Sequence, residues 1–287
     1  MNNYVIMTDS SCDLPADMAV QLGISVIPLS VLINNNTYAN YLDGREIGFK
    51  DYYAILRSGA MGKTSAANVF DFTNEMEKYL KEGMDILYLG FSSALSGTYN
   101  SSTVAAEELK DRYPDRKILT IDTLCASMGQ GLMVYLAAKK KNEGASIDEV
   151  YSYVEKTKLH LCHWFTVDDL NHLKRGGRVS AVAATFGTIL NIKPVMHVDD
   201  EGRLTPVEKV RGRKASLNGL IKMMNETITD KSIAFISHGD CEEEALALAE
   251  RIKEMGVKEV VISYVGPVIG THSGPGTMAL FFLGTAR

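Results

Sequence analysis

The chain has few of the residues that mark exported, membrane-spanning or metal-binding proteins. Its four cysteines lie far apart in 287 residues, at Cys12, Cys125, Cys162 and Cys241. This spacing argues against a zinc site and against a disulfide framework. No apolar stretch reaches 18 residues, and no basic segment followed by an apolar core stands at the N-terminus. We therefore expect no transmembrane segment, no signal peptide and a cytoplasmic location.

Positive charge is also scarce. Thirty basic and 35 acidic residues give a net charge of −5, and no basic run stands out. This balance argues against nucleic-acid binding through a general positive surface. Pro- or Ser-rich linkers and internal repeats are absent as well. A hydrophobic content of 46% over this length instead predicts two closely packed domains, each with its own core.

Strand-like and helical segments alternate through residues 1–160. Three apolar runs of strand length each lead into a polar turn and then a helical pattern: 4–7, 86–89 and 117–121. This alternation predicts an N-terminal α/β domain with a mostly parallel sheet, whose ligand would lie beyond the carboxyl ends of the strands. The polar turns that would meet there are 8–15, 91–98 and 122–127.

Residues 161–287 have a different pattern. Two strand-like runs, 192–198 and 204–210, flank the sequence Asp199-Asp200-Glu201-Gly202, which is typical of a β-hairpin. Helical segments lie on both sides of this hairpin, including the apolar stretch 180–190. A hairpin among helices predicts a C-terminal α+β domain with a mixed or antiparallel sheet.

The serine-rich turn before the helix at Thr98 is a candidate anion site. A helix N-terminus leaves backbone N–H groups unpaired, and here they would lie beside Ser92, Ser93 and Ser96. Hydroxyl and amide groups could then converge on a carboxylate or a phosphate. An ordinary capped helix start explains this segment equally well.

Two enzyme motifs are matched only in part. Gly62-Lys63-Thr64 ends like a phosphate-binding loop, but Arg57 stands where that motif requires its first glycine. Gly90-Phe91-Ser92-Ser93-Ala94 lacks the closing glycine of a nucleophile elbow. A serine-dependent esterase or acyl-transferase that uses Ser93 or Ser96 with His272 remains an alternative.

Two other segments combine polar side chains with turn residues. Residues 266–276 contain four glycines, two prolines and His272, a composition that allows close approach of a ligand. Residues 173–178 place three cations around two glycines, which indicates either a solvated helix end or a docking surface for an acidic partner. Arg211 or Arg213 could reach inwards and neutralise a buried carboxylate.

Together these segments resemble the DegV family. The resemblance rests on Thr8–Pro15, Thr64-Ser65, Ser92–Tyr99, Asp122-Thr123, Leu173–Arg178, Ile192–Pro194, Arg211–Lys214 and Ile269–Gly276. It implies a bacterial two-domain protein, here 1–160 and 161–287, with a tunnel for a long-chain fatty acid between the domains. Characterised members are the acyl-binding subunit of fatty acid kinase and present the carboxylate to a separate ATP-binding subunit similar to dihydroxyacetone kinase.

The resemblance also implies a head-group site in the first domain. Thr64 and Ser93 match the hydroxyls that hold the carboxylate in the family, and Ser65 and Ser96 lie next to them. One departure is Ala66-Ala67, where members usually carry a glutamine-proline pair.

Residues of the second domain complete the implied site. His272 and Arg211 match positions near the head group, with Arg213 as the alternative to Arg211. Arg175 and Arg178 would dock the kinase subunit. The resemblance implies no metal and no cofactor besides the bound fatty acid.

A fatty acid suits the physics of such a site. It needs an apolar slot for its tail and a few aimed polar groups for its head. Each buried CH₂ contributes about 0.8 kcal/mol, so the tail supplies most of the affinity and the head contacts set orientation. We therefore predict a lipid-binding protein without catalysis of its own, with a lipid-responsive regulatory protein as a further alternative.

Overall fold

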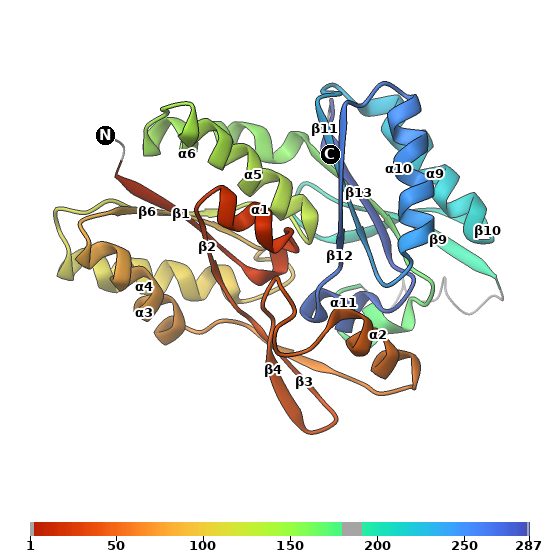
Figure 1. The fold of residues 1–287 in the computed structure, drawn as a ribbon, viewed down its shortest axis with the longest axis horizontal. Helices are drawn as coiled ribbons and strands as arrows, with labels where there is room; N and C mark the ends of the chain where they lie inside the picture. The colour runs from red at the N-terminus through yellow and green to blue at the C-terminus, as the bar shows by residue number, and fades with distance from the viewer. Residues whose placement is uncertain (1–2, 180–190, 286) are drawn as a thin grey trace.

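Figure 1 shows the computed structural model of the chain, which describes residues 3–179, 191–285 and 287. The strands of these residues form a four-stranded parallel sheet, a six-stranded mixed sheet and a small three-stranded sheet. This architecture confirms the predicted α/β fold class with a parallel and a mixed sheet. The predicted helix at 180–190 lies outside the described residues, and the domain boundary near residue 160 stays a prediction.

The parallel sheet has helices on both faces. Its strand order is β2 (Ile24–Ile27), β1 (Tyr4–Asp9), β6 (Asp85–Gly90) and β7 (Ile118–Asp122). Side chains of β1 alternate between the faces, so Met7 packs with α3 (Val69–Lys81) and α4 (Thr98–Arg112), while Ile6 packs on the opposite side. The helices on that side are α5 (Met128–Asn142) and α6 (Ile147–Thr157). A short 3₁₀ turn η1 (Ser10–Cys12) and α1 (Ala16–Gln21) connect β1 to β2.

The mixed sheet is built from the second half of the chain. Its strand order is β10 (Leu204–Arg211), β9 (Ile192–Val198), β8 (Leu161–Thr166), β13 (Met278–Leu283), β11 (Ile233–His238) and β12 (Glu259–Tyr264). All neighbours are antiparallel except β11 and β12. The pairing of β9 with β10 confirms the hairpin predicted around Asp199–Gly202.

Helix α5 packs between the two large sheets. It contacts β1 and β6 of the parallel sheet as well as β8, β11 and β13 of the mixed sheet. Leu132 of α5 shares one apolar cluster with Leu87 of β6 and with Phe235 and Phe281 of the mixed sheet. The other face of the mixed sheet is covered by α9 (Arg213–Thr227) and α10 (Glu242–Glu254). The sheets are therefore fixed to each other through a shared core.

A small antiparallel sheet lies beside the parallel one in Figure 1. It consists of β4 (Asn36–Ala39), β3 (Ser30–Ile33) and β5 (Lys63–Ser65), and α2 (Phe49–Arg57) joins β4 to β5. Tyr53 of α2 donates a hydrogen bond to the Val265 carbonyl at 2.8 Å, and Tyr52 bonds to Thr271. These bonds hold the small sheet against the second half of the chain.

Two segments rich in small or turn-forming residues contain regular structure. Within 58–68, residues 63–65 form strand β5 because they pair with β3. The glycine- and proline-rich segment 266–276 contains helix α11 (Pro267–Ser273). Proline stands at the first position of this helix, where its missing N–H costs nothing.

The described residues were searched for membrane-spanning helices and for metal-binding groups. Among the described residues, no helix is both long and apolar enough to cross a bilayer. In the same part of the chain, no group of three or more His, Cys, Asp or Glu side chains is arranged to hold a metal ion. Ser146 and Glu149 form a capping box at the start of α6.

Candidate functional site

The polar turns after β1, β6 and β7 meet at one edge of the parallel sheet. Thr8 donates a hydrogen bond to the Leu89 carbonyl at 2.8 Å, and the Ser92 N–H donates to the Cys125 carbonyl at 3.0 Å. The predicted convergence of these turns is therefore confirmed. It follows from the parallel topology, which brings the carboxyl ends of neighbouring strands to the same edge.

A cavity of about 190 Å³ lies between this edge and the mixed sheet. Apolar side chains from both halves of the chain line it: Leu29, Phe91, Leu95, Phe165, Leu173, Val198, Leu204, Val265, Val268, Ile269 and Phe281. Hydroxyl groups and two histidines are interspersed among them. An apolar cavity with a few polar groups is the usual form of a small-ligand site.

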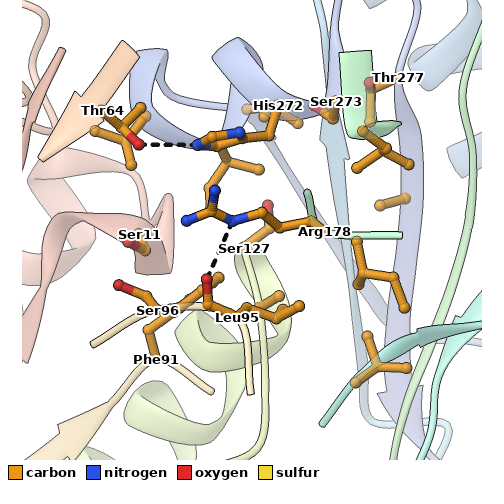
Figure 2. A pocket seen from close by; sticks show the side chains of 18 of the residues that line it. Ser11, Thr64, Phe91, Leu95, Ser96, Ser127, Arg178, His272, Ser273 and Thr277 are labelled. Carbon is orange, nitrogen blue, oxygen red and sulfur yellow. Dashed lines mark hydrogen bonds between the residues drawn. The ribbon is translucent and has the colours of Figure 1, made fainter. Parts of the chain in front are cut away.

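One end of the cavity, which we call the neck, is formed by Thr64, Arg178 and His272. The Thr64 hydroxyl and Nε2 of His272 lie 2.8 Å apart, and this bond joins β5 to α11 (Figure 2). Arg178 donates from Nε to the Leu95 carbonyl at 3.1 Å and also bonds to the Gly176 carbonyl. Three segments far apart in the sequence thus place a hydroxyl, an imidazole and a guanidinium together.

The neck is electrostatically positive at neutral pH. Burial, with a smaller contribution from the nearby Arg178 cation, lowers the pKa of His272 to about 4, so its imidazole is neutral. Arginine stays protonated. Among the described residues that line the cavity, Arg178 is the one permanent cation, and none is a carboxylate. This arrangement favours an anionic group on the ligand.

A second hollow, of about 450 Å³, lies on the outer side of the neck. Thr64, Arg178 and His272 line both spaces, so the neck separates the inner cavity from this outer hollow. Lys63 and Arg175 add two exposed cations to its wall, and no carboxylate lines it among the described residues. An anion at the neck can therefore be approached by a second anionic group from outside.

Comparisons with known proteins agree with this geometry. A family model described as an uncharacterised protein of the DegV family matches residues 3–285. The chain belongs to the DegV family. A DegV domain-containing protein of Clostridium perfringens is 49% identical over 290 residues, which cover 100% of this chain and 99% of the relative.

Solved structures of DegV proteins share the fold. A DegV family protein from Thermus thermophilus, named for fatty acid binding, has a TM-score of 0.87 and 31% identity, with 97% of this chain and 98% of that one covered. A DegV lipid-binding protein from Thermotoga maritima has a TM-score of 0.86 and 31% identity, with 99% of both chains covered.

The serines expected from the DegV resemblance do not all reach the cavity. Ser65 and Ser96 line it together with Thr64. Ser93 does not; its side chain is exposed, and its N–H donates to Asp122. The turn between β6 and α4 points successive side chains in different directions, so Ser96 faces the cavity and Ser93 does not.

The esterase alternative lacks its catalytic pair in this structure. Nε2 of His272 is bonded to Thr64 and not to a serine. The Ser96 hydroxyl lies 2.9 Å from the Thr98 hydroxyl, and Ser93 lies outside the cavity. Neither Ser93 nor Ser96 is therefore placed with His272 as a nucleophile and its base would be.

The arginine at the neck differs from the expected one. Arg211 lies exposed on β10 opposite Ile192, and Arg213 is bonded to Glu244 at 2.7 Å, so neither lines the cavity. Arg211 ends the edge strand β10, and Arg213 begins α9, where it also contacts Cys241 and Asp168. Arg178, expected to face a partner, occupies the neck instead, whereas Arg175 is exposed.

Two glycines explain how Arg178 reaches the neck. Gly177 has a φ of 71°, and the Arg178 N–H donates to the Leu173 carbonyl, so the chain reverses after α7 (Asn171–Arg175). A Cβ at Gly176 would overlap the His272 ring. The sequence signal was present in Gly176-Gly177, but it does not reveal which way the reversed chain points.

Proposed function

We propose that this DegV protein binds a long-chain fatty acid, with the carboxylate at the neck and the hydrocarbon chain in the apolar cavity. The single observation that carries the proposal is the neck itself, where a half-buried cation and a bonded Thr64–His272 pair close one end of a mainly apolar space. The names of the Thermus and Thermotoga structures, at 31% identity, support it.

The energetics divide between the two parts of the ligand. Burying the chain contributes about 0.8 kcal/mol per CH₂ group, which is ample for tight binding of a long acid. A charge-assisted hydrogen bond from Arg178 contributes about 1.5–3 kcal/mol and selects a carboxylate over a neutral ester or alcohol. Hydroxyls of Thr64 and Ser96 complete the shell of donors in our proposal.

We further propose that the protein presents this carboxylate to a separate ATP-dependent kinase subunit. A carboxylate oxygen would attack the γ-phosphorus of ATP, forming an O–P bond as the bond to the β-phosphate oxygen breaks and ADP leaves. Lys63 and Arg175 in the outer hollow support this proposal, because they face the side from which a phosphoryl donor would arrive. The protein itself supplies orientation and charge, not catalysis.

Lipid extraction tests the binding proposal directly. Mass spectrometry of organic extracts of the purified protein should show fatty acids of long chain length. Protein stripped of lipid should then rebind oleate with one molecule per chain, measured by calorimetry. A protein that purifies empty and also fails to bind added oleate would contradict the proposal.

The kinase step is tested at the outer hollow. Replacing Arg175 with glutamate reverses a charge outside the cavity, so it should slow acyl-phosphate formation by an added kinase subunit while oleate binding is retained. Asp169→Lys offers a control of similar exposure outside the hollow. Equal rates for wild type and Arg175→Glu would remove this residue from the docking surface.

A further inference from the structure

The mixed sheet forms one side of the cavity, and its register shows how far the cavity extends from the neck. Successive side chains of a strand point to opposite faces. On β13 and the residue before it, the cavity is lined by Thr277, Ala279 and Phe281. The Thr277 hydroxyl donates to the Gly274 carbonyl at 2.7 Å, at the end of α11, which carries His272; Figure 2 shows Thr277 and His272 along one border of the cavity. The series therefore starts near the neck and runs away from it to Phe281.

The next position on this face of β13 lies in the packed core. Leu283 pairs with Leu161 of β8, and neither side chain lines the cavity. Both pack in the apolar cluster that contains residues of α5. Phe281 belongs to the same cluster and is 3% exposed. It is therefore the last residue of β13 that faces the cavity before the shared core begins.

Phe281 is backed by a histidine that is fixed in place. The His163 ring meets the Phe281 ring edge to face, with centroids 5.4 Å apart. Nδ1 of His163 donates to the Leu161 carbonyl at 2.9 Å, and Nε2 accepts from the Ala126 N–H at 3.3 Å. Burial keeps the pKa of His163 well below its usual range, so the ring stays neutral. A Cβ at Gly129 would overlap this ring, so α5 packs directly against it. We call Phe281 and His163 the end pair.

The position before the end pair is small. Ala279 lies between Phe165 of β8 and Ser237 of β11 in the register, and all three residues line the cavity. A methyl group here leaves space in front of the sheet that a larger side chain would fill. Along the direction away from the neck, β13 thus provides first room for a chain and then a ring that blocks it.

We propose that the end pair sets the longest hydrocarbon chain that the cavity accepts, and that Ala279 sets the space just before it. The proposal rests on the proposed function, since it assigns the far end of the same ligand. Each CH₂ group that a short chain adds inside the cavity should raise affinity about fourfold. A chain beyond the limit must bend or pull its carboxylate away from the neck, so the gain stops.

A series of saturated acids tests the proposal. Acids from laurate to arachidate, in steps of one CH₂ group, compete with radiolabelled oleate for the wild-type protein at concentrations below those at which they aggregate. Affinity should rise about fourfold per CH₂ group and then stop rising or fall at one length, which we call the break. An affinity that rises at the same rate up to arachidate would overturn the proposal while fatty acid binding stands.

Two substitutions on β13 should move the break in opposite directions. Phe281→Ala removes the ring, so the break should move to acids longer by about two to four CH₂ groups, since part of the vacated space is lost as neighbours relax. Ala279→Leu fills the space before the end pair and should move the break to shorter acids. Phe282→Ala is the matched control, because Phe282 lies on the opposite face of the same strand and does not line the cavity. It should lose a similar amount of stability and keep the break.

A smaller substitution keeps the test valid if the alanine variant does not fold. Phe281→Leu retains a large apolar side chain and should move the break by about one CH₂ group to longer acids. Circular dichroism and urea denaturation show which variants are folded. An unchanged break in folded Phe281→Leu and Ala279→Leu proteins, or an equal shift in Phe282→Ala, would overturn the assignment to the end pair. Failure of oleate and of every saturated acid to bind the wild-type protein would count against fatty acid binding as a whole.

Discussion

The two walls of the cavity are held in different ways. On the wall formed by the parallel sheet, Asp9 accepts hydrogen bonds from four groups: the N–H groups of Ser11 and Phe91, the Tyr88 hydroxyl and the Gln130 amide. On the opposite wall, His272 has one side-chain bond, to Thr64, and Arg178 bonds only to two backbone carbonyls among the described residues.

This difference separates structural polar groups from those available to a ligand. The carboxyl of Asp9 is enclosed by its donors and is absent from the cavity lining. Arg178 and His272 line both the cavity and the outer hollow. We infer that the first wall fixes the shape of the site, and that the second wall supplies its chemistry.

The first way to test this contrast is to remove Asp9. Asp9→Ala leaves four buried donors without their acceptor, so we expect the free energy of unfolding to fall by about 4 kcal/mol. Urea denaturation followed by circular dichroism measures this loss. Asp43→Ala is the control, because Asp43 is exposed and pairs with Arg45 at the surface, where an ion pair contributes less than about 1 kcal/mol. Similar losses in both variants would show that the Asp9 network is not structural.

The second test is the pH dependence of stability in lipid-free protein. The pKa of His272 is about 4 when folded, against 6.5 for an ordinary histidine. The unfolded chain therefore binds a proton first as the pH falls, and stability is lost between about pH 6.5 and pH 4, by up to about 3 kcal/mol. His272→Gln should remove this part of the decline. An unchanged acid limb in the variant would contradict the buried, neutral imidazole.

Asp13, on the first wall, should show the opposite slope. Its pKa is raised by burial from 3.8 to about 8, so the folded protein holds this proton more tightly. The resulting stability is present below about pH 4 and is lost as the pH rises towards 8. Asp13→Asn should remove this decline. Because it overlaps the His272 effect between about pH 4 and 6.5 with the opposite sign, each variant is compared with the wild type across the whole range.

Sequence patterns predicted the features that depend on local chemistry. The hairpin at Asp199–Gly202 depends on residues only a few positions apart. The convergence of the polar turns followed from parallel topology alone. Thr64 and His272 were both named as candidate site residues, but the sequence did not show that they would touch. Tyr52 and Tyr53 of α2 bond to Thr271 and to the Val265 carbonyl, and these bonds hold the small sheet that carries Thr64 against α11.

The sequence did not predict the direction in which individual side chains of the site point. Ser93 and Ser96 occupy the same turn, and no spacing rule distinguishes which hydroxyl faces the cavity. Arg178 was assigned to an outer surface because the DegV resemblance implied that it docks the kinase subunit. Its actual position depends on the reversal at Gly177 and on a bond to Leu95, 83 residues away along the chain. Such long-range contacts leave no periodic signal.

The smallest expected effect gives the sharpest test of the second wall. Arg178→Met keeps a long side chain but removes the cation at the neck, so we expect oleate affinity to fall about 10- to 100-fold with little loss of stability. Arg178→Lys should recover only part of this loss, since a single ammonium replaces a planar fork of donors. Lys174→Met removes an exposed cation of the same segment that lines neither space, and it should bind oleate normally. Equal oleate affinity in the Arg178→Met and Lys174→Met proteins would mean that the carboxylate is not held at the neck.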